Sequence, residues 1–240
     1  SLMMVAFGRE LCLSNADLID VGLGGLLHDV GEIKPPANVS QIQRIKNITK
    51  FKIYKDHVHE GLRILEADQQ GERVQNSKIV RQIIENHHEF YDGTGYPKGR
   101  SRGQIGLYGN MIIIVDNYIS MITGRSCDQP LTPSQAIRLM HQHKGTKFHP
   151  QMLEQFIQLI GMYPVGSHVQ LNTGDVAVVM KQNKERKMKP VVMVFADKRG
   201  VKISKPVHID LMTQAEGDRQ LFITKEVAAD QVEMRIEDYL

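Results

Sequence analysis

Apolar residues recur every three or four positions through roughly the first 160 residues, a period that predicts amphipathic helices. The first helix begins with Leu2, Val5 and Ala6 and ends near Ser14. Ser14 can cap a second helix that runs to Leu27, because a serine side chain accepts a bond from a free N–H of the first turn. Further helices are expected over residues 51–65, 77–88, 104–123, 132–144 and 150–161.

The hydrophobic period changes after residue 161. Short runs rich in β-branched residues are separated by turn-like segments, which is typical of a small antiparallel sheet of three to five strands. The strands are expected over residues 168–171, 176–180, 191–195 and 207–211, and a final helix over 226–240. The fold class is therefore mainly α, with a helical domain over 1–162 and a small C-terminal β extension over 163–240.

Composition and charge narrow the class of protein. The chain has 240 residues, 41% of them hydrophobic, and a net charge of only +3, so it can bury a core and does not demand nucleic acid or an acidic membrane. Nucleic acid is not expected as a partner, since no aromatic residues interleave the basic run 181–189. No apolar run is long enough to span a membrane. Cys12 and Cys127 are expected to be buried thiols in a reducing compartment, which favours the cytoplasm.

Candidate metal ligands stand at the ends of two helical segments about sixty residues apart. His28 and Asp29 are adjacent in one segment, His87 and His88 are adjacent in the other, and Asp116 follows the apolar run 111–115. Imidazole and carboxylate together suit Fe, Mn, Zn or Ni, and one carboxylate can bridge two ions. Two ions roughly 3.5–4 Å apart can activate a water and stabilise both the attacking and leaving oxygens of a phosphoester displacement.

From residue 1 to about 165 the chain resembles the HD-GYP subgroup of the HD phosphohydrolase superfamily. The resemblance rests on His28-Asp29, His57 with Gly61, His87-His88-Glu89, the block Asp92-Gly93-Thr94-Gly95-Tyr96-Pro97, and Asp116 with Arg125. It implies an HD-type helical bundle that hydrolyses the bacterial second messenger cyclic di-GMP. It also implies a centre of two divalent ions, or three in the full-length protein, with iron or manganese expected.

The resemblance assigns roles to these residues. His28, Asp29 and Asp116 would hold one ion, with Asp29 bridging to a second held by His57, His87 and His88. Arg125 would reach a substrate phosphate through its planar guanidinium, so Asp29 and Arg125 are the expected catalytic residues. The loop residues would contact substrate or a partner such as a diguanylate cyclase domain: Asp92, Gly93, Gly95, Tyr96 and Pro97. His59 falls on another helical face and is expected to be exposed.

The chain departs from the family pattern at two charged positions. A lysine that helps to hold phosphate is replaced by Glu32, and a basic residue three positions after Arg125 is replaced by Asp128. A like charge 4–6 Å from an anionic substrate costs about 1–4 kcal/mol. The chain also starts just after the position of a family histidine that normally precedes Ser1, so the domain is expected to be incomplete at its N-terminus.

The sequence is therefore compatible with three functions. The first is a phosphodiesterase that converts cyclic di-GMP to linear pGpG, to GMP, or to both. The second is a catalytically weakened module that senses a ligand or docks onto a diguanylate cyclase domain. The third is a metallohydrolase of another cyclic dinucleotide or phosphate ester.

Overall fold

The computed structural model describes residues 1–33, 55–67, 71–125, 129–183, 186, 189–214 and 220–227. They belong to two compact units, one comprising Ser1–Pro130 with Leu139–Leu159 and the other Leu131–Arg138 with Ile160–Leu240. Asp128, Cys127 and the start of the helix predicted over 51–65 lie outside the described residues. Of the helix predicted over 226–240, only residues 226 and 227 are described, and Glu226 ends a strand instead.

The first unit is helical, as predicted. Its elements are α1 (Leu2–Glu10), α2 (Asn15–Leu27), the 3-10 turn η1 (Val30–Ile33), α4 (His57–Ala67), α5 (Glu72–Asn76), α6 (Lys78–Asn86), the 3-10 turn η3 (Arg102–Gln104), α7 (Gly106–Ile122) and α9 (Pro150–Ile160). Helix α8 (Pro133–Gln142) begins in the second unit and ends in the first. No described helix has both the length and the apolar character to cross a membrane.

Side-chain caps set where the two helices next to the candidate site begin. The Ser14 hydroxyl accepts from the Asp17 N–H at 3.2 Å at the start of α2. The Ser77 hydroxyl accepts from the Val80 N–H at 3.2 Å at the start of α6 and donates to Asp20 at 2.7 Å. Because Asp20 is on α2, the cap of α6 also joins the two helices that end at the candidate ligands.

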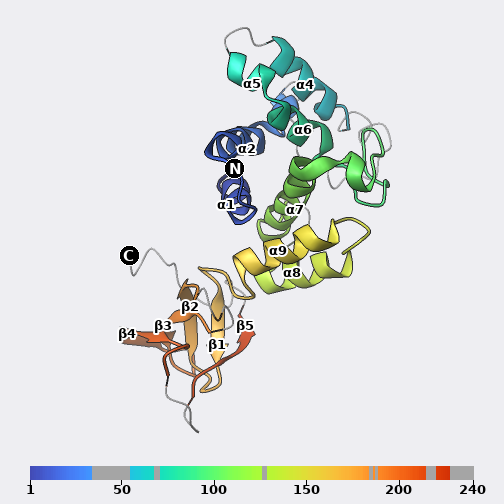
Figure 1. Cartoon of the computed structure of the whole chain (residues 1–240). Helices are drawn as coiled ribbons and strands as arrows, with labels where there is room; N and C mark the ends of the chain where they lie inside the picture. The colour runs from blue at the N-terminus through green and yellow to red at the C-terminus, as the bar shows by residue number, and fades with distance from the viewer. Residues whose placement is uncertain are drawn as a thin grey trace. The chain divides into compact units, whose positions relative to one another are not determined.

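The core of the first unit forms around α7, in which five consecutive residues, 111–115, are buried. Helix α6 packs against both α2 and α7 (Figure 1). Gly24 lies at this contact: a Cβ there would be 2.5 Å from Cδ1 and 3.2 Å from Cβ of Ile83, so the Ile83 side chain would have to move. Gly24 thus allows close packing of α2 on α6 just before His28 and Asp29.

The second unit holds a five-stranded antiparallel sheet in the order β4-β3-β2-β1-β5 (Figure 1). Its strands are β1 (His168–Leu171), β2 (Val176–Lys181), β3 (Val191–Ala196), β4 (Lys202–Asp210) and β5 (Ile223–Glu226). The inner strands are buried on both faces: Val179 pairs with Val192 in one apolar cluster, and Val178 with Met193 in the other. The start of α8 is joined to β5, because the Ser134 N–H donates to Glu226 at 3.0 Å.

Three details differ from the sequence predictions. Strand β4 begins at Lys202, five residues earlier than expected, and strand β5 was not predicted. Cys12 is exposed, so the expectation of a buried thiol there is wrong. Cys12 lies after the last residue of α1 with a positive φ of 58°, in a surface turn that leads to α2.

Candidate metal centre

Gly31 allows η1 and α4 to come close enough to place an aspartate beside a histidine. A Cβ on Gly31 would lie 1.9 Å from the carbonyl oxygen of His57 and 2.6 Å from the backbone nitrogen of Gly61. Only a residue without a side chain permits this backbone contact. Asp29, just before η1, therefore lies close to His57 at the start of α4.

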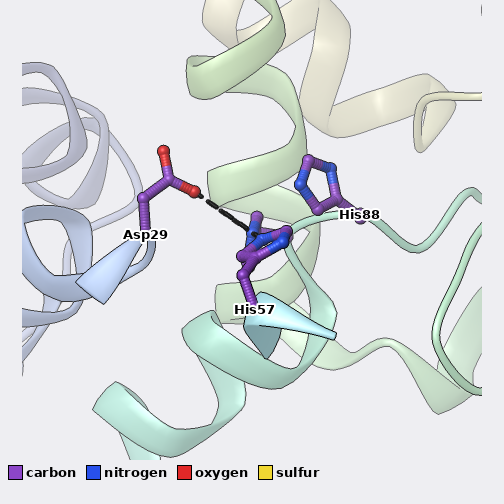
Figure 2. A group of neighbouring side chains, drawn as sticks. Asp29, His57 and His88 are labelled. Atoms are coloured by element: carbon purple, nitrogen blue, oxygen red, sulfur yellow. Dashed lines mark hydrogen bonds and ion pairs between the residues drawn. The ribbon is translucent and has the colours of Figure 1, made fainter. Parts of the chain in front are cut away.

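Four side chains from three parts of the chain converge at one point. Asp29, His57, His87 and His88 each offer one ligand atom, and these four atoms all lie within 4.8 Å of one another. The Asp29 Oδ1 atom is 3.4 Å from Nε2 of His87 and 3.9 Å from Nε2 of His57. Figure 2 shows Asp29 directed toward the histidines that come from α4 and from the end of α6. His57 and His87 are fully buried.

Backbone carbonyls decide which ring nitrogens face this centre as acceptors. Nδ1 of His87 is 2.8 Å from the carbonyl oxygen of Ile84, and Nδ1 of His28 is 3.1 Å from that of Gly25. A carbonyl can only accept, so each Nδ1 carries a proton and donates it. In the neutral rings Nε2 then presents its lone pair, which is the arrangement that a metal-binding histidine needs.

A second group of charged side chains lies next to the four candidate ligands, and Asp29 belongs to both groups. Its other oxygen, Oδ2, is 3.1 Å from Nε2 of His28, which is itself 3.5 Å from Oδ1 of Asp116. The two oxygens of Asp29 thus face different histidine groups. Arg125 donates to Asp116 at 2.7 Å and to Ser120 at 3.2 Å, and its Nη1 lies 3.6 Å from Asp29 Oδ2.

The mutual arrangement shifts the pKa values of the centre. Burial alone would lower the pKa of His28, but hydrogen bonding and charge from Asp116 and Asp29 outweigh it and raise the pKa to about 10. Burial would raise the pKa of Asp29, yet His28 and His87 hold it far below its usual range. Burial, followed by the charges of His87 and His57, keeps the pKa of His88 well below 6.5, so this ring is neutral.

Two sets of contacts hold the Gly-Tyr-Pro loop (residues 92–100) against the centre. Both carboxylate oxygens of the buried Glu89 accept backbone bonds, from Lys98 N–H at 2.8 Å and Arg100 N–H at 2.9 Å. Tyr96 stacks on His88 with ring centroids 4.6 Å apart, and its N–H donates to the His88 carbonyl at 3.0 Å. These contacts connect the loop conformation with the orientation of His88.

Individual loop residues have local roles. A Cβ on Gly95 would lie 2.4 Å from the backbone nitrogen of Phe90, so the loop can fold back on its own start only with glycine there. Gly93 has a φ of 85°, and the peptide bond between Tyr96 and Pro97 is cis. Asp92 is exposed and accepts from the hydroxyl and N–H of Thr94, which keeps it away from the four-residue group.

Sequence reasoning missed two supporting residues. Glu89 was read only as part of the His-His-Glu motif, although its burial and its two backbone bonds organise the loop. The ammonium of Lys55 lies 4.8 Å from the ring centroid of Tyr96. No pattern in the sequence predicts this contact. Among the candidates, His59 is 56% exposed and pairs with Asp56, as expected of a residue outside the centre.

Comparison with known proteins shows the family. A family model described as HD domain matches residues 2–152. The chain belongs to the HD domain family. A second model, described as KOW domain associated with HD domain, matches residues 168–235 of this HD-domain protein and so covers the β sheet. The resemblance inferred from the motifs is confirmed.

Several curated relatives are phosphodiesterases of cyclic dinucleotides. A cyclic di-GMP phosphodiesterase of Pseudomonas aeruginosa is 33% identical over 218 residues, which are 90% of this chain and 51% of that protein. A cyclic di-GMP phosphodiesterase of Thermotoga maritima is 28% identical over 63% of this chain and 40% of its own length. A 3'3'-cGAMP-specific phosphodiesterase of Vibrio cholerae is 27% identical over 62% of this chain and 27% of its own. The chain thus spans about half or less of these relatives.

Among solved structures, an HDG"Y"P protein from Bdellovibrio bacteriovorus aligns over 64% of this chain and 47% of its own, with 22% identity and a TM-score of 0.49.

Proposed function

We propose that this HD domain is the catalytic part of a metal-dependent phosphodiesterase that hydrolyses cyclic di-GMP to pGpG, to GMP, or to both. The observation that carries the proposal is the position of Asp29. Its Oδ1 faces His87 and His57 while its Oδ2 faces His28, so one carboxylate links two sets of nitrogen donors. The names of the Pseudomonas and Thermotoga relatives support the choice of substrate.

The donor set fits two divalent ions. Asp29, His28 and Asp116 would hold one ion, and Asp29 with His57, His87 and His88 would hold the other. Mixed imidazole and carboxylate donors suit iron or manganese, which we propose as the bound metals. When bound, such ions supply Lewis acidity toward a phosphoryl oxygen and lower the pKa of a coordinated water.

The surrounding residues bind and orient the substrate. Arg125 is 47% exposed and lies beside both aspartates, so its guanidinium can reach a phosphate at the open side of the centre. Asp116 fixes the orientation of that guanidinium through the 2.7 Å bond. The carbonyls of Gly25 and Ile84 keep the His28 and His87 rings in the tautomer that faces the metals.

A second candidate is hydrolysis of a different cyclic dinucleotide. The 3'3'-cGAMP-specific relative and the replacement of a phosphate-binding lysine by Glu32 both favour it. We also propose the Gly-Tyr-Pro loop as the place where a diguanylate cyclase domain would dock, since Lys98 and Gly99 at its turn are exposed while Tyr96 is held on His88.

The test is metal analysis by mass spectrometry on anaerobically purified protein, paired with turnover assays. Cyclic di-GMP and 3'3'-cGAMP are each incubated with the chain and with added Mn²⁺ or Fe²⁺, and the products are separated by chromatography. We expect two metal equivalents and faster loss of cyclic di-GMP. Bound metal with faster loss of 3'3'-cGAMP would move the assignment to the second candidate. A protein that binds no metal would overturn both enzymatic proposals and leave the docking module.

A further inference from the structure

Lys147 places a cation between two aromatic rings in the turn that connects α8 to α9. Its Nζ lies 4.6 Å from the ring centroid of Phe90 and 5.8 Å from that of Phe148. Phe148 is fully buried, and Phe90 is two residues beyond His88. In the part of the chain that the structure describes, the Lys147 ammonium forms neither an ion pair nor a hydrogen bond.

The backbone of this turn is bound to the segment that follows the histidine pair. The N–H of Tyr91 donates to the carbonyl of Lys147 at 3.2 Å, and the N–H of Asp92 donates to that of Thr146 at 2.8 Å. Lys147 is therefore held in register with the start of the Gly-Tyr-Pro loop. A surface lysine on a free turn would not be fixed in this way.

The electrostatic surroundings connect Lys147 with the centre. Burial lowers the pKa of Lys147, and the carboxylate of Asp116 opposes that shift. Asp116 is the residue that pairs with Arg125. The charge of Lys147 is thus coupled to that of one carboxylate of the candidate centre.

Within the described part of the chain, the half-buried Lys147 ammonium contacts two rings but no acceptor for its three N–H groups. Aromatic faces attract a cation, with about 0.5–2 kcal/mol per contact, but they do not replace hydrogen bonds to an anion. Desolvation of a charged group is costly unless the charge is paired. The rings therefore hold the ammonium in place while leaving its hydrogen-bonding capacity for a ligand.

We propose that Lys147 is a substrate-binding residue that donates to a phosphate oxygen of the cyclic dinucleotide. The inference rests on the proposed function, and it adds Lys147 to Arg125 as a second cation that binds phosphate. It also accounts for the charge balance of the site. Glu32 stands where the family pattern has a lysine, and Lys147 supplies a positive charge from a different part of the chain.

The test compares three variants of the whole chain. Lys147→Met keeps an aliphatic stem between Phe90 and Phe148 and removes the charge, and Lys147→Arg keeps the charge. The matched control is Lys144→Met, three positions earlier, which removes a lysine that pairs with Glu154. For each protein, kcat and KM for cyclic di-GMP are measured with Mn²⁺, and the Kd of cyclic di-GMP is measured by calorimetry in EDTA.

We expect Lys147→Met to raise both KM and Kd about tenfold to a hundredfold, as for loss of a charge-assisted hydrogen bond, with little change in kcat. Lys147→Arg and Lys144→Met should stay within a few fold of the unmodified chain. KM and Kd within twofold of the unmodified chain in Lys147→Met would overturn the inference. If Lys147→Met lowers Tm markedly, the Lys147→Arg variant decides the question. A normal Kd for cyclic di-GMP in Lys147→Arg supports a role for the charge, and a weakened Kd overturns the inference.

Failure of the proposed function gives a different pattern. If the unmodified chain does not hydrolyse cyclic di-GMP, that function fails, but the calorimetric comparison still decides on Lys147. Binding that weakens in Lys147→Met supports a phosphate-binding lysine in a non-hydrolysing module. Equal binding, or no binding by the unmodified chain, overturns the inference.

Discussion

The Nε2 atoms of His57 and His87 face each other at 3.0 Å although the residues are thirty positions apart. Because Nδ1 of His87 donates to the Ile84 carbonyl, its Nε2 has a lone pair in the neutral ring. Two lone pairs directed at one another repel unless one ring donates a proton or both share a cation. Asp29 faces the same pair, which suits the divalent ion that we propose for these residues.

The first prediction concerns metal retention. His87→Ala should lower the bound metal by at least one equivalent and reduce turnover by at least about a hundredfold, since it removes a direct ligand. Mass spectrometry and a turnover assay measure both. His59→Ala is the control, because His59 is on the same stretch of chain as His57 but is exposed. Full metal content in His87→Ala would contradict the assigned centre.

The second prediction concerns the contact between η1 and α4. Gly31→Ala should destabilise the chain by about 1–3 kcal/mol or more, because its Cβ would overlap the His57 carbonyl. Displacing η1 should also weaken metal binding through Asp29. Urea unfolding and metal titration check the two effects. Gly103→Ala is the matched control, since a Cβ there meets nothing within 4 Å.

The third prediction concerns the pH dependence of the metal-free protein. The pKa of His28 is raised from 6.5 to about 10 in the folded state. Its stabilising contribution is therefore complete below pH 6.5 and is lost as pH rises toward 10. Urea unfolding in EDTA at pH 6, 8 and 10 should show the stability difference between the unmodified chain and His28→Gln shrinking with pH. A constant difference would argue against the His28–Asp29–Asp116 interaction.

The same protonation predicts how metal binding responds to pH. A metal that binds His28 must displace the proton on its Nε2. Metal affinity should therefore rise as the pH rises, and protons should be released when metal binds at neutral pH. Calorimetry in buffers of different ionisation enthalpy measures the number released. Binding without proton release would show that His28 is not a ligand.

The fourth prediction concerns the acidic residue that departs from the family pattern. Burial, and then the charge of Asp29, raise the pKa of Glu32, which places its carboxyl within electrostatic reach of the centre. Glu32→Gln should lower KM for cyclic di-GMP about threefold to thirtyfold by removing repulsion, with a smaller effect at high salt. Glu72→Gln, on the exposed surface of α5, is the control. An unchanged KM would mean that Glu32 does not meet the substrate.

Local interactions made most elements predictable from the sequence. The cap at Ser14 forms as expected, Ser77 caps α6 in the same way, and Thr132 and Gln135 exchange the bonds of a capping box at the start of α8. Such bonds join residues three positions apart and need no information from elsewhere in the chain. Strand β5 was missed because the strand with which it pairs, β1, lies some fifty residues earlier.

The candidate ligands of the centre could also be inferred from the sequence, since the His-Asp pair, the His-His pair and Asp116 together offer the donors of a metal site and match a family pattern. Their arrangement could not. That the two oxygens of Asp29 face different histidines depends on Gly31, which lets the backbone of η1 contact that of α4. That Glu89 serves the loop depends on the path of residues 98–100.

By itself, then, the sequence determined the helical period, the caps and the set of candidate ligands, because each depends on neighbours along the chain. The tertiary structure decided which oxygen faces which nitrogen, that Glu89 binds the backbone of the loop, and which rings the Lys147 ammonium contacts. Those relationships are set by packing between segments far apart in sequence, where a few tenths of an ångström separate contact from overlap.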